Sequence, residues 1–263
     1  MTARRPGATA LAPGARSAVW AGVGSLARVT QPDPPAHRPI PTVPGGLFVS
    51  FEGGDGAGKS TQSRLLGDWL SGLGLTVVLT REPGGTDLGR VLRREVLHGE
   101  HVDARTEALL YAADRAHHVA SLVRPALAAG SVVVTDRYLD SSVAYQGTGR
   151  ELGAQEVEDL SLWATGGLLP ALTVLLDLDP ADGLGRLRAR PDQPDRLESA
   201  GDAFHRRTRE AFLARAAADP GRWLVLDAAR PVDAIAADVR ARVAALLGLD
   251  AAADAAADAG GAR

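Results

Sequence analysis

The chain has 263 residues, of which 45% are hydrophobic, enough to build the core of one α/β domain of ordinary size. Its formal net charge of −3 gives no overall attraction to nucleic acid or to an anionic membrane surface. The chain has no cysteine, which excludes disulfides, thiolate metal sites and a thiol nucleophile, and no apolar run of about 18 residues that would span a bilayer. We expect a cytoplasmic protein whose partners include neither nucleic acid nor a membrane.

Both ends of the chain have a biased composition. Residues 1–44 are rich in alanine, proline, glycine and arginine and contain no acidic residue before Asp33. We interpret this segment as a disordered arm, with an organellar transit segment, an alanine- and arginine-biased coding composition or a misassigned start as the alternatives. The tail 251–263 is of low complexity, so the expected domain spans residues 45–250.

Between these ends, short apolar segments that favour strands alternate with amphipathic segments that favour helices. The expected strands are Leu47–Glu52, Leu75–Thr80, Ser131–Thr135, Ala171–Asp177 and Trp223–Asp227. The expected helices are Lys59–Ser71, Leu88–Leu97, Thr106–Ala129, Glu151–Thr165, Asp182–Arg190, Ala203–Ala218 and Val232–Leu247. This alternation predicts an α/β fold with a five-stranded parallel sheet covered by helices on both faces. Ligands of such folds bind at the carboxyl ends of the strands.

A complete phosphate-binding motif follows the first expected strand and opens the first expected helix. The pattern G-x-x-x-x-G-K-[ST] is matched by Gly53, Gly54, Asp55, Gly56, Ala57, Gly58, Lys59 and Ser60, and Thr61 follows it. Backbone N–H groups and the helix N-terminus would hold the β-phosphate of a nucleotide, and Lys59 would neutralise its β and γ oxygens. The Ser60 hydroxyl would ligate Mg²⁺. The motif therefore predicts a P-loop NTPase fold that binds ATP, without specifying the reaction.

A second pair of residues predicts a site for the group that accepts the phosphate. The chain lacks asparagine altogether, so it cannot form the Asn-Lys-x-Asp guanine reader of GTPases. Asp136 and Arg137 end a buried strand, where Asp136 would hold the water shell of the magnesium ion and Arg137 would face an acceptor phosphate. A purely structural ion pair at the strand end is the alternative.

Two more segments could line the pocket of the acceptor. Tyr111 and Arg115 lie four positions apart in an expected helix, so a base could stack on the ring while the guanidinium binds its carbonyl edge. Tyr111 could equally belong to the core. The polar residues that follow Arg137 could form one pocket wall or simply a polar loop; they are Ser141, Ser142, Tyr145 and Gln146.

Other polar residues on these helices are expected to have no role in the site. We interpret Asp114 as a solvated charge, because it points to a different side of its helix from Tyr111 and Arg115. Four of the six histidines form two close pairs that lack the carboxylate or cysteine neighbours of a metal site, so we interpret them as surface or helix-end residues. These are His98, His101, His117 and His118.

Taken in order, the motifs resemble those of the bacterial thymidylate kinase family. The resemblance rests on Phe51–Thr61, Thr80–Thr86, Leu109–Arg115, Asp136–Tyr138, Ala144–Gly147 and Asp195–Glu198. It runs from about Leu47 to Leu247, and the Arg-Glu-Pro-Gly-Gly-Thr run is its most specific part, because P-loop proteins in general do not need it. The resemblance implies ATP-dependent phosphorylation of dTMP to dTDP, in dTTP synthesis, by in-line transfer with Mg²⁺ as cofactor in a homodimer.

The resemblance also assigns roles to individual residues. The thymine base would stack on Tyr111, where the family often has phenylalanine, and bind Arg115 through its O4 atom. Tyr145 would lie beneath the sugar and disfavour a 2′-hydroxyl. The whole expected dTMP site comprises Asp55, Glu82, Pro83, Tyr111, Arg115, Arg137, Ser141, Ser142, Tyr145 and Gln146.

We expect arginines of a mobile lid, at about residues 183–198, to neutralise the negative charge of the transferred phosphoryl group. Some family members carry an arginine inside the P-loop, where this chain has Gly56. The lid arginines are Arg186, Arg188, Arg190 and Arg196, of which Arg190 best matches the family's catalytic position. A solvated basic helix face is the alternative for these arginines. The expected catalytic set is Lys59, Asp55, Arg137 and Arg190.

Two other functions remain open from the sequence. The chain could phosphorylate another nucleoside monophosphate or a deoxynucleoside. It could also be a catalytically silent nucleotide-binding module, against which the intact Lys59, Ser60, Asp136 and Arg137 argue.

Overall fold

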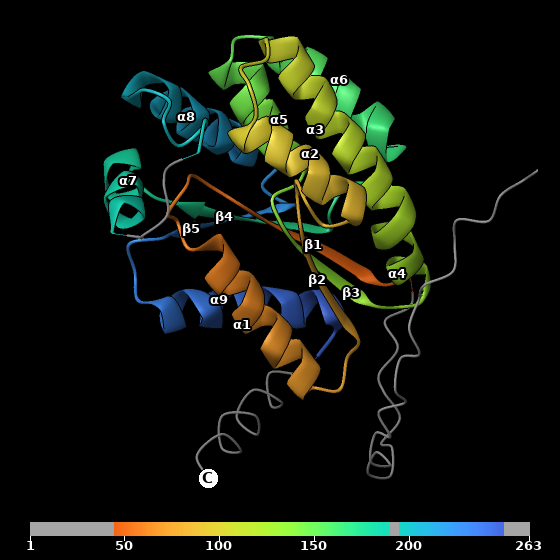
Figure 1. Ribbon diagram of the computed structural model, residues 1–263. Coiled ribbons are helices and arrows are strands. Elements are labelled where there is room, and N and C mark those ends of the chain that lie inside the picture. The colour runs from red at the N-terminus through yellow and green to blue at the C-terminus, as the bar shows by residue number, and fades with distance from the viewer. Residues whose placement is uncertain (1–44, 190–194, 250–263) are drawn as a thin grey trace, which may run out of the picture. The chain divides into compact units, whose positions relative to one another are not determined.

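A five-stranded parallel sheet lies at the centre of the computed structural model (Figure 1), which describes residues 45–189 and 195–249. Its strands are β1 (Leu47–Glu52), β2 (Val77–Arg81), β3 (Val132–Asp136), β4 (Leu172–Asp177) and β5 (Trp223–Asp227). They are ordered β2-β3-β1-β4-β5, and every neighbouring pair is parallel. The predicted α/β fold with its parallel sheet is confirmed.

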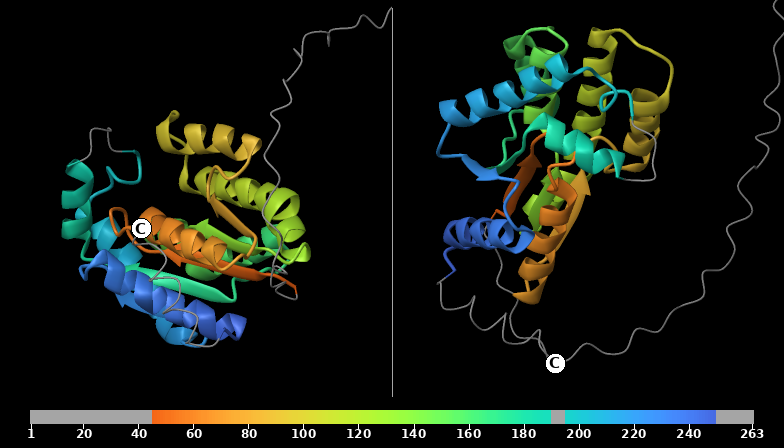
Figure 2. Two further views of the ribbon diagram at one scale, coloured as in Figure 1. Left: turned by 90° about the horizontal axis from the view of Figure 1, so that it is seen from below. Right: turned by 90° about the vertical axis from the view of Figure 1, so that its left-hand side faces the viewer.

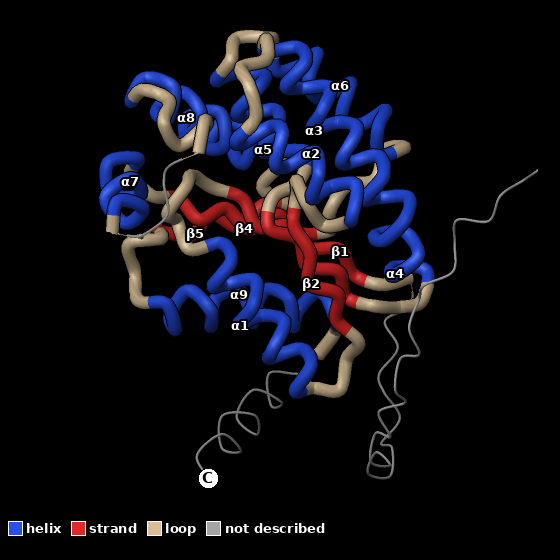
Figure 3. The backbone as a smooth tube through the Cα atoms, in the orientation of Figure 1, coloured by secondary structure: helices blue, strands red, loops and turns tan. Residues whose placement is uncertain are grey.

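Helices cover both faces of this sheet (Figure 3). They are α1 (Lys59–Gly72), α2 (Asp87–His98), α3 (Ala104–His118), α4 (Arg124–Ala128), α5 (Leu139–Ser142), α6 (Ala154–Thr165), α7 (Pro180–Arg188), α8 (Asp202–Ala218) and α9 (Val232–Leu247). Two π-helical segments, η1 (Val119–Val123) and η2 (Val143–Gly149), continue α3 and α5. Helices α1 and α9 lie below the sheet in Figure 1, whereas α2, α3, α5, α6 and α8 lie above it. Within the described ranges, no helix combines the length and apolar character needed to cross a bilayer.

The central strand β1 is buried along its whole length, because helices pack on both of its faces. Val49 and Phe51 pack into the cluster formed with α1 and α9. Phe48 points the other way and joins Val119 and Tyr138. Alternate side chains of one strand thereby bind two helical layers to the sheet. This fixes the carboxyl end of β1, from which the P-loop departs.

The structure corrects two predictions of helix bounds and shows that the segment after β3 is helical, which the sequence left open. The helix expected over Thr106–Ala129 is interrupted by η1 immediately before α4, which has Pro125 in its first turn. Proline has no N–H to donate and crowds the preceding turn, which explains the wider turns there. The polar segment after β3 is helical, as α5 and η2, and α6 begins at Ala154, after Gly153 at a φ of 99°.

Some predictions fall on residues that are not described. These are the arm 1–44, the tail 251–263, and the tip of the lid with Arg190.

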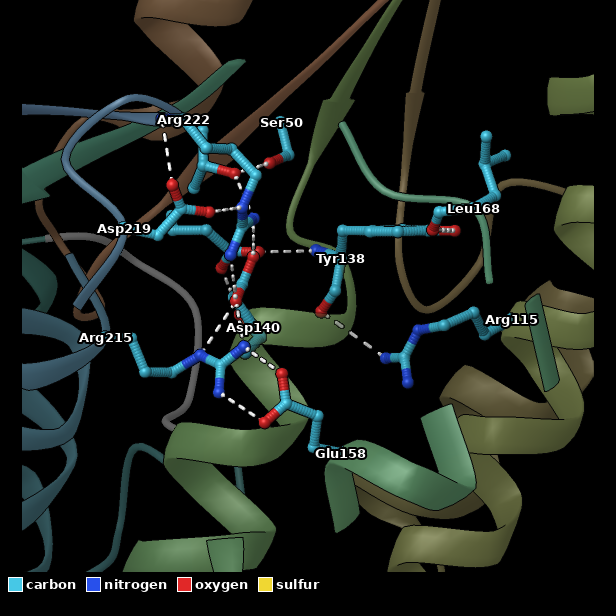
Figure 4. Close-up of polar contacts among 12 residues, drawn as sticks. Ser50, Arg115, Tyr138, Asp140, Glu158, Leu168, Arg215, Asp219 and Arg222 are labelled. Carbon is cyan, nitrogen blue, oxygen red and sulfur yellow. Dashed lines mark hydrogen bonds and ion pairs between the residues drawn. The ribbon is translucent and has the colours of Figure 1, made fainter. Parts of the chain in front are cut away.

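The buried carboxylate of Asp140 joins α5 to one arginine of α8 and to another that follows α8 (Figure 4). Asp140 has a fully buried side chain and accepts hydrogen bonds from Arg215 Nε at 2.8 Å and Arg222 Nη1 at 2.7 Å. Arg215 also binds Glu158 of α6, and Arg222 also binds Asp219 after α8. Each guanidinium group therefore links α5 to a further element.

We predict that Asp140→Asn lowers the free energy of unfolding by about 3 kcal/mol, because it leaves two largely buried guanidinium groups without their shared carboxylate. Urea unfolding followed by circular dichroism measures this difference.

Asp219→Asn is the matched control, since Asp219 binds the same Arg222 but its side chain is 53% exposed. We expect this substitution to cost less than about 1 kcal/mol. Equal losses in the two variants would contradict the role given to the buried carboxylate.

Candidate active site

A cavity of about 210 Å³ lies at the carboxyl ends of β1, β2 and β3. It brings together most residues that the sequence predicted for the two substrate sites. Those that line it are Asp55, Gly56, Gly58, Lys59, Ser60, Thr61, Glu82, Pro83, Tyr111, Arg115, Asp136, Arg137, Ser141, Ser142, Tyr145 and Gln146. Gly53, Gly54 and Ala57 complete the P-loop without lining this cavity.

The P-loop holds Lys59 through its own backbone. Gly58 adopts a left-handed conformation, with a φ of 96°, and caps the start of α1. The Lys59 ammonium donates to the carbonyl oxygens of Gly53 at 3.0 Å and Gly54 at 2.7 Å. Burial, and next the charge of Arg137, lower the pKa of Lys59 to about 8. The ammonium is thus held where it can shift to a phosphate oxygen at neutral pH.

Two oxygen ligands at the P-loop fit a magnesium ion. The Ser60 hydroxyl donates to the Asp136 carboxylate at 2.5 Å, which joins the start of α1 to the end of β3. Mg²⁺ prefers such hard ligands and usually takes only one or two of them from the protein, with the rest from water and phosphate. No cluster of three or more histidine or carboxylate side chains that could hold a metal occurs in the part of the chain that the structure describes. The donor set suits a metal bound largely through a nucleotide.

Arg137 lies between the P-loop and the rest of the cavity, at the end of β3. Its Nη1 donates to Gly53 O at 3.2 Å and Ser141 Oγ at 2.9 Å, and its Nη2 to Asp55 Oδ1 at 2.5 Å and the Tyr145 hydroxyl at 3.1 Å. The guanidinium also lies 4.8 Å from the centre of the Tyr145 ring. The backbone of Arg137 is left-handed, with a φ of 70°. This conformation is unfavourable outside glycine, so the network must hold it in place.

The Asp55 carboxylate stays ionised beside Arg137. Burial by itself would raise the pKa of Asp55, but the positive charges of Arg137 and Lys59 outweigh it and lower the pKa to about 2. The P-loop therefore keeps a negative charge between two cations at neutral pH.

The far end of the cavity is built on α3. Tyr111 and Arg115 share one face of the helix, as their spacing predicted, and both are buried. Arg115 donates through Nε to Glu82 at 2.7 Å, through Nη1 to Ser161 at 3.0 Å and through Nη2 to Ser142 at 2.9 Å. The guanidinium is therefore held rigidly.

Of two predictions about α3, the one for Asp114 is wrong, whereas His118 does end the helix but does not lie at the surface. His118 is fully buried, with Nδ1 bonded to Glu82 at 2.8 Å and Nε2 to Thr80 at 2.7 Å. Asp114 is 1% exposed and accepts a hydrogen bond from the Gly84 N–H at 3.3 Å. Burial raises the pKa of Asp114 to about 6. The reason is that the loop after β2 packs onto α3, so polar side chains on more than one side of the helix are covered.

The sequence did not single out several polar residues of the site. Arg81 and Arg93 line the cavity, and Arg93 Nη1 donates to Pro83 O at 3.1 Å. Glu52 is buried at the end of β1 and accepts from the Tyr138 N–H at 2.8 Å and Ser141 Oγ at 2.6 Å. Burial, and next the nearby Asp140, raise the pKa of Glu52 to about 8. Arg81 and Glu52 lie at carboxyl ends of strands, a signal that could have identified them; Arg93 has no comparable signal.

The predicted lid arginines have different surroundings. Arg186 of α7 donates to Gly56 O at 3.4 Å and Ala228 O at 3.2 Å. Arg196 donates to Glu107 of α3 at 3.0 Å. Arg188 is exposed. Arg186 and Arg196 thus already bind protein groups.

Helix α7 packs directly on the P-loop backbone (Figures 1 and 2). A Cβ atom on Gly56 would lie 2.3 Å from Gly183 O, and one on Gly183 would lie 2.4 Å from Asp55 O. Both distances are far below any van der Waals contact. The loop and the helix can therefore approach this closely only because glycine stands at both positions, a contact that the sequence analysis did not anticipate.

Comparison with known proteins gives a consistent result. The family model described as thymidylate kinase matches residues 51–239. A thymidylate kinase of Leifsonia xyli is 60% identical over 205 residues, which is 78% of this chain and 97% of that protein. Those of Clavibacter sepedonicus and Deinococcus radiodurans are 61% and 52% identical, over 77% and 75% of this chain and 96% of each relative.

We predict that Gly183→Ala weakens ADP binding by about tenfold, because the added methyl group forces α7 or the P-loop to move, at a cost of about 1–3 kcal/mol. Isothermal titration calorimetry measures the dissociation constant.

Gly185→Ala lies in the same helix, and apart from the adjacent backbone of that helix no atom lies within 4 Å of the added Cβ. We expect it to bind ADP as the unsubstituted protein does. Normal binding by Gly183→Ala would show that α7 does not restrain the P-loop.

Proposed function

Since this chain belongs to the thymidylate kinase family, we propose that it transfers the γ-phosphoryl group of ATP to dTMP, with Mg²⁺. One observation carries the proposal: a single cavity extends from the P-loop at Lys59 to Tyr111 and Arg115, with Arg137 between them. Such a cavity suits two nucleotides whose phosphates meet at its centre. Phosphoryl transfer requires this alignment more than covalent chemistry.

The donor phosphates would bind to the P-loop. Their oxygens would take the Lys59 ammonium from the carbonyls of Gly53 and Gly54, and the backbone N–H groups at the start of α1 would complete the site. Ser60 and Asp136 would hold the magnesium ion, which would neutralise charge on the phosphates. These contacts favour a γ-phosphate directed at Arg137.

The acceptor phosphate would bind to Arg137. Both hydrogens on each of its terminal nitrogens donate to protein oxygens, so a phosphate bound to these nitrogens would replace at least one of the bonds. The phosphate would then be held by a guanidinium that is already oriented. Because a phosphate monoester is ionised at neutral pH, the reaction needs no strong general base. Asp55 would instead keep Arg137 in position.

The base would bind at the far end of the cavity. Its ring would stack on Tyr111, whose hydroxyl stays protonated because burial raises the pKa of Tyr111. One Nη1 hydrogen of Arg115 has no acceptor among the described residues and would donate to O4 of thymine. The 5-methyl group contributes only about 1–3 kcal/mol, so we expect some turnover of dUMP.

A homodimer in the cytoplasm is part of the proposal. Leu109 of α3 and Trp163 of α6 are 56% and 82% exposed, and their burial between two copies would favour association. Sedimentation equilibrium tests this. We expect the unsubstituted protein to have twice the mass of the chain, and Trp163→Asp to have an average mass closer to that of the monomer. A monomeric unsubstituted protein would refute the dimer.

We predict dTMP- and ATP-dependent turnover by the unsubstituted protein. It should fall by about 10²-fold or more in Lys59→Ala and by about 10³-fold in Arg190→Ala, because each substitution removes a cation that would neutralise the transferred phosphoryl group. A coupled assay of ADP release measures the rates of both variants beside the unsubstituted protein.

Arg188→Ala is the control for the lid, since Arg188 is exposed in the same segment and we expect it to change kcat little. Near-normal turnover by Arg190→Ala would assign the catalytic role to another arginine.

A panel of dTMP, dUMP, CMP, AMP and thymidine tests the acceptor, and no preference for dTMP would refute the proposed substrate. Nucleotide binding without transfer would favour a silent binding module.

A further inference from the structure

We infer that Glu107 determines the base selectivity of the cavity, by fixing the side-chain amide of Gln146 with its oxygen toward the base. The inference rests on the proposed function and deepens it. It makes Glu107 a positioning residue that acts on the substrate through Gln146.

The Glu107 carboxylate is buried and surrounded by hydrogen-bond donors. Oε1 accepts from Gln146 Nε2 at 2.9 Å and from Arg150 Nε at 3.3 Å. Oε2 accepts from Arg150 Nη2 at 3.3 Å and from Arg196 Nη2 at 3.0 Å. The side chain of Glu107 is only 2% exposed and forms ion pairs with both guanidinium groups. The result is a carboxylate that accepts hydrogen bonds and has none to donate.

Because the Glu107 carboxylate can only accept hydrogen bonds, the Gln146 amide has only one favourable orientation beside it. Its NH₂ group must face Glu107, because the amide oxygen in that place would meet a carboxylate oxygen with no hydrogen between them. Gln146 is 2% exposed and lies in η2, so it has no room to turn toward solvent. Its amide oxygen has no hydrogen-bond partner in the described part of the chain, and the residue lines the cavity. The oxygen is therefore available to the base.

An amide oxygen at this place distinguishes two classes of pyrimidine. Thymine and uracil carry an N3–H donor, which the oxygen accepts. Cytosine has an unprotonated N3 whose lone pair would face the oxygen, and it has an amino group in place of O4. Arg115, which can only donate, disfavours that amino group as well. Gln146 and Arg115 thus both favour pyrimidines with an N3–H donor and an O4 acceptor, which occupy adjacent positions on the ring.

The selectivity between dUMP and dCMP tests this role, because these substrates differ only in the groups at positions 3 and 4. We expect Glu107→Gln to lower the ratio of kcat/KM for dUMP to that for dCMP by about tenfold, since the neutral amide lets Gln146 turn its NH₂ group to N3 of cytosine. The contribution of Arg115 is the same in both proteins and cancels from the comparison. A purely structural role of Glu107 would lower both values together and leave the ratio unchanged.

Glu158→Gln is the matched control, because it removes a carboxylate that binds Arg215 at 2.9 Å and does not line the cavity. We expect its ratio to equal that of the unsubstituted protein. Glu107→Gln leaves the guanidinium groups of Arg150 and Arg196 without their carboxylate. The double variant Glu107→Gln/Arg150→Gln removes one of these two groups and has the net charge of the unsubstituted protein. It should show the same fall in the ratio if the single variant does not fold in thermal unfolding.

An unchanged ratio in a folded Glu107 variant that still turns over dTMP would overturn the inference. Absence of dTMP and dUMP turnover by the unsubstituted protein is a separate outcome, because it would refute the proposed function itself.

Discussion

The ion pair between Asp55 and Arg137 is the contact on which the site depends. It joins the P-loop after β1 to the end of β3. Together with hydrogen bonds from the Thr135 hydroxyl to Arg137 O and from the Arg137 N–H to Phe51 O, it holds Arg137 in a left-handed backbone conformation. Because the two strands are paired in parallel register, with Phe51 beside Asp136, both residues leave the sheet at the same edge. The geometry of the sheet thus brings the P-loop and Arg137 together.

Other buried carboxylates bind their partners in a similar way. Glu82 holds Arg115 and His118, Glu107 holds Gln146 with two arginines, and Asp140 holds two arginines across the helical layer. A buried charge costs stability unless it is paired and hydrogen-bonded, so each carboxylate fixes the positions of the groups around it. The polar residues that would contact a substrate are oriented by these anchors. A rigid cavity of this kind can distinguish ligands that differ by one hydrogen-bonding group.

Much of this site could be predicted from the sequence. The P-loop motif, the acid and base that end β3 and the spacing of Tyr111 and Arg115 all depend on local geometry, which a sequence pattern carries directly. The burial of Asp114 and His118 could not be predicted, because it depends on the loop after β2 packing onto α3. The wider turns of η1 and η2 were missed for a related reason, since helical periodicity alone does not distinguish an α-helix from a π-helix.

The amino-acid sequence by itself determined the parallel α/β fold, the P-loop motif and the family, because these follow from hydrophobic periodicity and from motifs that lie within single segments. Only the tertiary structure decided which donors and acceptors remain available in the cavity. Arg196 binds Glu107, and Gln146 presents its amide oxygen as a consequence. Such pairings join segments far apart in the chain, and burial makes them obligatory, so they appear only once the helices have packed on the sheet.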